Sequence, residues 1–299
     1  MTTNRRGFAL LAALWVTTAL SAMALAGLLV ARDVVRGSQN RVALMRGRWR
    51  AEDCFERSRI AIDDALNGRI PGGSWENLDQ VVAVAPAVTA AACDVTLRPS
   101  DIAVNVNAAD ADQLLMVLKA IGIGEPTADS MVDALLDWRD ADDIPRPMGA
   151  ERDWYQANGR FVPRNGPLAD VRELKRVRGF EMIPDSILDA VFTVEPGRII
   201  WNRAPLIVLA SLPGVGEEAM ARIIERRSRD IPIDLFSLAG GLSPTAQQML
   251  AARFGELQQL TTDRPDAWIL TARGGGYAFE VRLASAGSRA AIVRRRTTP

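Results

Sequence analysis

An unbroken apolar segment near the N-terminus is the strongest feature of the hydropathy pattern. Residues 8–31 carry no charged side chain, follow the leader MTTNRRG, and are followed at once by Arg32 and Asp33. A helix of this length rises about 1.5 Å per residue, so it spans the hydrocarbon core of a bilayer and satisfies its own backbone hydrogen bonds there. Because Arg5 and Arg6 precede the segment, the positive-inside rule places the leader in the cytoplasm and the rest of the chain on the other side.

Three interpretations of this segment are open: a plain single-pass anchor, a secretory signal peptide with a weak cleavage sequence at residues 21–24, and a type IV prepilin signal. The junction Arg6-Gly7-Phe8 resembles the prepilin signal. In that family a peptidase cuts after the glycine and the new amino terminus is methylated, so the resemblance implies processing between Gly7 and Phe8. Most of the family carry glutamate at the fifth mature position, where this chain has Ala12.

Beyond the anchor the spacing of apolar positions predicts one long helix and several strands. Residues 34–66 keep a loose helical spacing, and Gly68 is a stop signal for that helix. Segments rich in Val, Ala and Thr, or with alternating apolar positions, predict antiparallel strands at 81–97, 268–271, 277–283 and 290–293.

These elements predict an α+β fold in which strands from both ends of the chain form one antiparallel sheet. The expected units are a leader (1–7), a transmembrane helix (8–31), a helix with the first strands (32–101), an inserted α-helical domain (102–262) and C-terminal strands (263–299).

The insertion contains a repeated pattern at residues 107–135 and 202–224. Each copy begins with asparagine, continues into an apolar helix and a Gly-x-Gly turn, and ends in a second helix. We expect Asn107 and Asn202 to be N-caps, and the glycines to form the tight turn. The pattern resembles a helix-hairpin-helix module.

Such a module has two possible uses. Its free N–H groups can hold a DNA phosphate, and the second copy supplies Arg222, Arg226, Arg227 and Arg229. The second helix of the first copy is acidic instead and would repel phosphate. We therefore favour a scaffold role over nucleic-acid binding.

Composition narrows the available chemistry. The 299 residues include 36 basic and 36 acidic side chains and no histidine. Histidine-dependent triads and imidazole-ligated zinc are therefore excluded, and we expect no enzyme. The two cysteines, Cys54 and Cys93, are expected on the exported side, where an oxidising compartment permits one disulfide between them.

An acidic loop follows the first hairpin. Six carboxylates fall within residues 137–153 around a Pro/Gly turn, and Ca²⁺ takes six to eight oxygen ligands from flexible loops of this kind. The alternative is a solvated loop neutralised by neighbouring arginines. The candidate metal ligands are Asp140, Asp142, Asp143, Glu151 and Asp153. After turn residues in the run that begins at Asn165, a further capped helix is expected to run to Gly179.

The segment WRDADDIPRPMGAERDWY at 138–155, the run NGPLADVRELKRVRGF at 165–180, the paired hairpins and the prepilin-like start together resemble protein K of the type II secretion system. The resemblance implies a minor pseudopilin, not an enzyme, with calcium in the helical domain. It also implies a single-pass protein of the inner membrane whose C-terminal domain lies in the periplasm. Two rival hypotheses are a membrane-tethered helix-hairpin-helix protein of DNA uptake and an enzyme that uses the acidic loop, such as a metal-dependent hydrolase.

The same resemblance implies the partners and the position in the assembly. The expected partners are prepilin peptidase and pseudopilins of the I, J and H types, and not nucleic acid. In related filaments the glutamate at the fifth mature position neutralises the amino terminus of a neighbouring subunit, because an unpaired charge in an apolar bundle is costly. A subunit with Ala12 is therefore expected at the tip of the periplasmic pseudopilus, where it initiates assembly.

Overall fold

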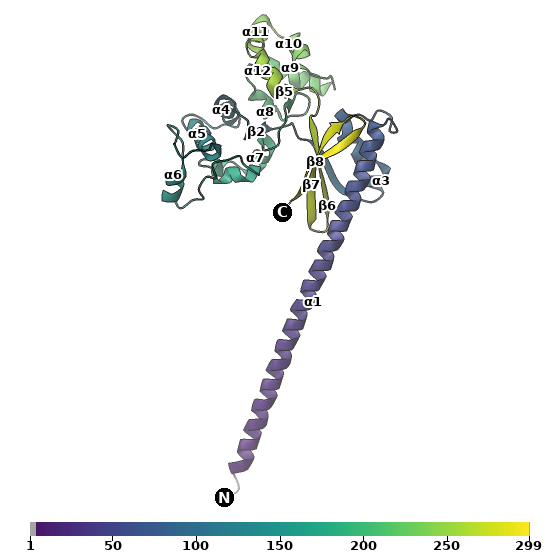
Figure 1. Ribbon diagram of the computed structural model, residues 1–299, viewed down its shortest axis with the longest axis vertical. Coiled ribbons are helices and arrows are strands. Elements are labelled where there is room, and N and C mark those ends of the chain that lie inside the picture. The colour runs from purple at the N-terminus through teal and green to yellow at the C-terminus, as the bar shows by residue number, and fades with distance from the viewer. Residues whose placement is uncertain (1–3, 299) are drawn as a thin grey trace.

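The computed structural model describes residues 4–298, with side chains from residue 10 to residue 297. Helix α1 (Asn4–Leu66) is its longest element, and its N-terminal half extends alone away from the rest of the molecule (Figure 1). This half is long and apolar enough to cross a membrane. The expected anchor and the amphipathic helix that follows it are therefore one continuous helix, which ends two residues before Gly68, at φ +71°.

The C-terminal end of α1 packs against a four-stranded antiparallel sheet. Its strands are β1 (Asp94–Pro99), β6 (Ala267–Gly274), β7 (Tyr277–Ala286) and β8 (Arg289–Thr298), in the order β1-β6-β7-β8. Phe55 of α1 meets Phe279 of β7 with ring centroids 5.8 Å apart, and Ile62 and Leu270 are buried beside them. The expected α+β class, with strands from both ends of the chain in one antiparallel sheet, is confirmed.

The strand prediction for residues 81–97 was wrong over its first half. The chain forms η1 (Trp75–Asn77), α2 (Leu78–Val84) and α3 (Pro86–Thr89) before it enters β1. The buried side chains recur at a helical spacing of three and four residues. They are Leu78, Val81, Val82, Ala85 and Val88. β-branched residues at this spacing formed helices because packing on α1 outweighed their strand propensity.

A disulfide joins α1 to the segment that enters the sheet. Cys54 and Cys93 have Cα atoms 5.4 Å apart, within the range that a disulfide spans. The bond lies beside the contact between α1 and the sheet.

The insertion between β1 and β6 forms two helical lobes. In Figure 1 the first lobe lies to the left of the sheet domain and the second lies above it. The first lobe is closed by parallel pairing of β2 (Val104–Asn105) with β3 (Phe192–Thr193), and the second by β4 (Ile199–Ile200) with β5 (Thr261–Thr262). The first contains α4 (Ala111–Ala120), α5 (Thr127–Arg139), α6 (Arg152–Ala157), η2 (Val171–Arg176), η3 (Phe180–Met182) and α7 (Asp185–Val191). The second contains α8 (Leu206–Ala210), α9 (Glu217–Ser228), α10 (Leu235–Ala239), α11 (Pro244–Ala252) and α12 (Phe254–Leu260). One hydrophobic core runs through both lobes, and a separate core lies between α1 and the sheet.

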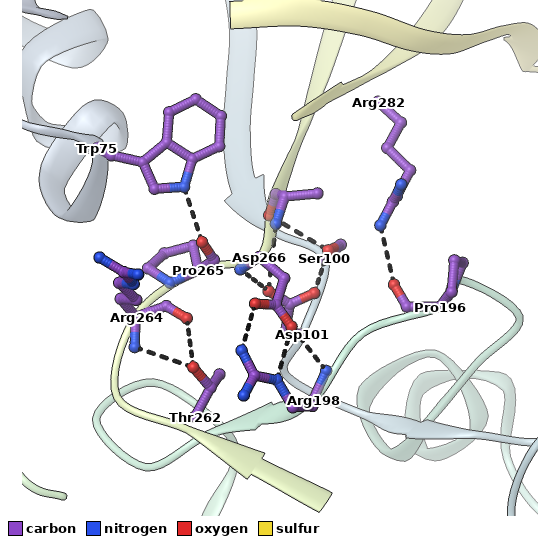
Figure 2. Close-up of polar contacts among 11 residues, drawn as sticks. Trp75, Ser100, Asp101, Pro196, Arg198, Thr262, Arg264, Pro265, Asp266 and Arg282 are labelled. Carbon is purple, nitrogen blue, oxygen red and sulfur yellow. Dashed lines mark hydrogen bonds and ion pairs between the residues drawn. The ribbon is translucent and has the colours of Figure 1, made fainter. Parts of the chain in front are cut away.

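A polar joint connects the lobes to the sheet, at the point where three segments cross (Figure 2). Asp101 follows β1, is 2% exposed, and accepts a hydrogen bond from the Asp266 N–H at 2.5 Å. Its own carbonyl oxygen accepts the Ile200 N–H at 2.9 Å. Arg198, in the linker between the lobes, donates to the Asp266 carboxylate at 2.8 and 3.1 Å. A Cβ placed on Gly197 would lie 2.1 Å from Asp101 Oδ1, so only glycine fits there.

Further contacts hold the same linker on the outer face of the sheet. Arg282 of β7 donates to the Pro196 carbonyl oxygen at 2.9 Å, and the buried Glu195 is paired with Arg294 of β8. The linker between the lobes is therefore fixed to both β7 and β8, in addition to the Asp101 contacts.

Candidate functional site

The acidic loop brings three carboxylates together. Asp137 lies in the last turn of α5, Asp140 directly follows that helix, and Glu151 precedes α6. One oxygen of each lies within 4.8 Å of the others. The intervening residues form the loop that returns the chain to the end of α5.

Polar groups of α5 hold this loop in place. Asp137 is fully buried and accepts a hydrogen bond from the Arg146 N–H at 3.2 Å. Asp133 accepts the Met148 N–H at 3.0 Å. A Cβ on Gly149 would lie 1.9 Å from Asp137 Oδ2, so the loop can approach this carboxylate closely only with glycine at this position.

The electrostatics of the three carboxylates favour a cation. Burial, followed by the charges of Asp137 and Asp140, raises the pKa of Glu151 to about 7. Burial also raises the pKa of Asp137 and of Asp140. Both oxygens of Glu151 and Asp140 Oδ1 are buried without a hydrogen-bond partner among the described residues. A bound cation would satisfy these oxygens, and an all-oxygen donor set is the kind that suits Ca²⁺.

The structure brings together two of the five predicted ligands. Asp140 and Glu151 belong to the carboxylate trio, whereas Asp142 accepts the Ile144 N–H at 2.9 Å. Asp143 lies 3.5 Å from the Arg152 guanidinium, and Asp153 is exposed on α6.

Sequence reasoning missed one member of this site, Asp137, as a candidate ligand. Asp137 precedes Asp140 by three residues, and this helical spacing could have indicated a shared face. Asn165 also contacts the acidic loop: its side-chain amide donates to the Asp142 carbonyl oxygen at 2.6 Å and to Asp143 Oδ1 at 2.9 Å, and no pattern in the sequence indicated this contact.

The expected N-caps were wrong, and the two asparagines have another role. Asp110 is the N-cap of α4, and its carboxylate accepts the Gln113 N–H. Asn107 instead pairs with both backbone groups of Leu168, at 2.8 and 2.9 Å.

Asn202 makes the same pair of bonds with Ile233, at 3.1 and 3.3 Å, and Pro205 precedes α8. In each lobe the asparagine side chain accepts a hydrogen bond from the N–H of one distant residue and donates one to its carbonyl oxygen. It therefore fixes a tertiary contact instead of a helix end.

In each lobe an arginine binds backbone carbonyl oxygens on both sides of this asparagine. Arg139 of α5 donates to the carbonyl oxygens of Val106 and Ala109, which lie one residue before and two residues after Asn107. Arg227 of α9 donates to the equivalent carbonyl oxygens beside Asn202, at 3.0 and 2.8 Å. The first lobe has 28 residues between this arginine and the residue bound by asparagine, and the second has only five. The acidic loop occupies that additional segment.

The predicted processing site lies at the start of α1. The backbone at Gly7 and Phe8 is helical, and their side chains lie outside the part of the chain whose side chains are described. Ala12 is exposed on the same helix.

Comparisons with known proteins identify the region around the site. Residues 77–183 match the family model of the type II secretion system protein K. The chain carries a protein K domain. The match runs from α2 through the acidic loop to η3, so the expected relationship to protein K is confirmed. No curated protein matches the chain.

A solved structure extends the likeness to the fold of nearly the whole chain. The match is to a chain of the GspK-GspI-GspJ complex from the enterotoxigenic Escherichia coli type 2 secretion system, with 16% sequence identity and a TM-score of 0.63. The alignment covers 89% of this chain and 99% of that chain. At this identity the match shows the fold alone.

Proposed function

We propose that this chain is a minor pseudopilin of the type II secretion system that forms the tip of the periplasmic pseudopilus and initiates its assembly. The observation that carries this proposal is the protein K match over residues 77–183. GspK is found in a complex with GspI and GspJ in the matched structure. We therefore propose pseudopilins of the I and J types as partners, with an H-type pseudopilin below them.

The anchor supports the same assignment. A prepilin peptidase would cut between Gly7 and Phe8, and the mature helix would remain in the inner membrane with the sheet and lobes in the periplasm. Ala12 then stands at the fifth mature position. Because it has no carboxylate to neutralise a preceding subunit, it suits the first subunit of a filament.

A surface for helical partners is present on α1. One face of α1 packs on the sheet through Ala51, Phe55 and Ile62. The opposite face carries a row of exposed apolar side chains, which are Val35, Val42, Met45 and Trp49. Trp49 is 71% exposed. This apolar stripe continues from the membrane segment, where neighbouring pseudopilin helices would pack.

Calcium is the second part of the proposal. Asp137, Asp140 and Glu151 would hold the ion. The bound charge would cancel the repulsion among the carboxylates and fix the acidic loop against α5.

We also propose that the hairpins are helix-hairpin-helix units used as scaffold, in a protein that is not an enzyme and does not bind nucleic acid. The Gly214 turn, which has the better match to the motif, lies against the Met249 carbonyl oxygen of the same chain. A phosphate would have to displace that helix to reach the turn.

Co-purification of the full-length chain with I- and J-type pseudopilins tests the proposed function. We expect Trp49→Asp to reduce the amount of recovered partner about tenfold, as for loss of a central aromatic anchor. Leu44→Asp, also at an exposed apolar position but on another face of α1, is the matched control and should retain partner binding. Equal recovery with all three forms of the chain would contradict the proposal.

A further inference from the structure

The two hairpin turns differ in what covers them. In the second lobe, α11 lies over the turn that contains Gly214 and Gly216. A Cβ on Gly214 would lie 2.8 Å from the Met249 carbonyl oxygen, and one on Gly216 would lie 3.6 Å from Met249 Cε. The Glu218 carboxylate accepts hydrogen bonds from the N–H and the hydroxyl of Ser243, the N-cap of α11, at 2.6 Å each. Helix α11 is therefore a fixed cover over this turn.

The equivalent turn of the first lobe is open. Where the second lobe has α11, the first has only the single turn η3 between η2 and α7. A Cβ placed on Gly122 or Gly124 would meet no atom within 4 Å. Ile123 at this turn is partly exposed, whereas Val215 at the matching position of the second lobe is buried. The hairpin turn of the first lobe is therefore exposed, whereas the equivalent turn of the second lobe is covered by α11.

The side chains around the open turn carry a net negative charge. Glu125 and Asp129 lie at the turn and at the start of α5. Lys119 is paired with Glu125, whereas the Asp129 carboxylate makes no hydrogen bond or ion pair with residues 10–297. The local surplus is negative, so a partner with a basic side chain near Asp129 is favoured.

We propose that residues 121–126 form a docking site for a basic amphipathic helix of a partner protein, which packs over this turn as α11 packs over the turn of the second lobe. This inference rests on the proposed function in one respect: the partner is expected to belong to the type II secretion system. The surface itself follows from the comparison of the two lobes. An apolar side chain of the partner would lie over the glycines, as Met249 does, and a lysine or arginine would face Asp129.

Photo-crosslinking in the assembled secretion system tests this site. A photoreactive amino acid is placed at Ile123 in the full-length chain, with Val215 as the covered control and Trp49 as the control for assembly. Cross-linked peptides are assigned by mass spectrometry. We expect position 123 to label one basic helical segment of another protein, and position 215 to label only α11 of its own chain.

Substitutions at the turn separate docking from folding. Gly124→Arg should leave the melting temperature unchanged, because its Cβ faces open space, and should reduce the position-123 cross-link about tenfold. The same change at Gly214 should lower the melting temperature, because its Cβ would lie 2.8 Å from the Met249 backbone carbonyl oxygen. Asp129→Lys should also weaken the cross-link.

Each outcome decides between the proposals. Labelling at position 49 without partner labelling at position 123 overturns the docking site and leaves the proposed function standing. Absence of partner labelling at both positions overturns both. A position-123 cross-link that persists unchanged in Gly124→Arg and Asp129→Lys, or that falls on an acidic or non-helical segment, rejects the proposed occupant.

Discussion

Asp101 gives the joint a dependence of stability on pH that can be measured. Burial raises the pKa of this carboxyl from 3.8 to about 6, although hydrogen bonds from Ser100 and from the Asp266 N–H act in the opposite direction. Asp266 is the neighbouring charge that raises the pKa further, and Arg198 is bound to Asp266. The native state therefore retains a proton on Asp101 at pH values where the unfolded chain has released it.

The sign and size of the effect follow from linkage. Because the folded state binds this proton more tightly, the free energy of unfolding falls as pH rises from about 4 to about 6. A pKa difference of about two units corresponds to about 3 kcal/mol, the largest contribution that this one group can make.

The perturbation is Asp101→Asn, which keeps the shape and removes the charge. The asparagine oxygen can accept the Asp266 N–H, and its NH₂ group can donate to the Ser100 hydroxyl oxygen, which lies beside Asp101 Oδ1. We expect the variant to match the parent near pH 4 and to be more stable by about 2–3 kcal/mol above pH 7.

Denaturant unfolding of the full-length chain in detergent, followed by circular dichroism at a series of pH values, measures this difference. Ser285→Ala, at an exposed position of β7, is a neutral control whose difference from the parent should not depend on pH. A flat difference between Asp101→Asn and the parent would refute the reasoning. So would a parent that gains stability over the variant as pH rises, because ionised Asp101 would then be the favoured form in the joint.

Three further predictions address the metal, the anchor and the disulfide. Chelation should lower the melting temperature of the parent but not of the Asp140→Asn, Glu151→Gln double variant, because an ion bound only to the native state stabilises it by mass action; differential scanning fluorimetry with and without Ca²⁺ decides this. Intact-mass analysis of membrane-derived protein should show that the leader is removed after Gly7, and a bulky residue there should leave the leader attached. Replacing Cys54 and Cys93 by alanine should cost about 4 kcal/mol in the chain-entropy model for a 39-residue separation, and an unchanged unfolding midpoint would exclude that contribution.

The parts of the fold that the sequence predicted are those whose local pattern agrees with their tertiary environment. The apolar run of residues 8–31 and the alternating strands near the C-terminus each carry their signal within a few residues. The helices at residues 78–89 were not predicted, because Val and Thr have strand propensity. Only the spacing of the positions that pack on α1 indicates a helix there.

The site was predicted in its chemistry and only partly in its members. An acidic cluster around a Pro/Gly turn is visible in the sequence, but the choice among its carboxylates depends on how the loop returns to α5. Asp137 joins the cluster because Gly149 permits a close backbone approach. The roles of Asn107 and Asn202 are also long-range, because each binds a residue brought near only by the closed lobe.

Packing, disulfide and polar contacts connect the exposed half of α1 to both lobes. The exposed half of α1 continues without a break into the half that is packed on the sheet and joined by the disulfide to the segment entering β1. β1 is paired with β6 along six residues, and the joint at Asp101 fixes the crossing between the two lobes to the beginning of β6. Because Arg282 and Arg294 hold the same crossing on β7 and β8, a tilt of α1 turns the sheet and carries the lobes with it. If α1 is the membrane anchor proposed above, its seating in the bilayer would therefore set the orientation of the acidic loop and of the open hairpin turn.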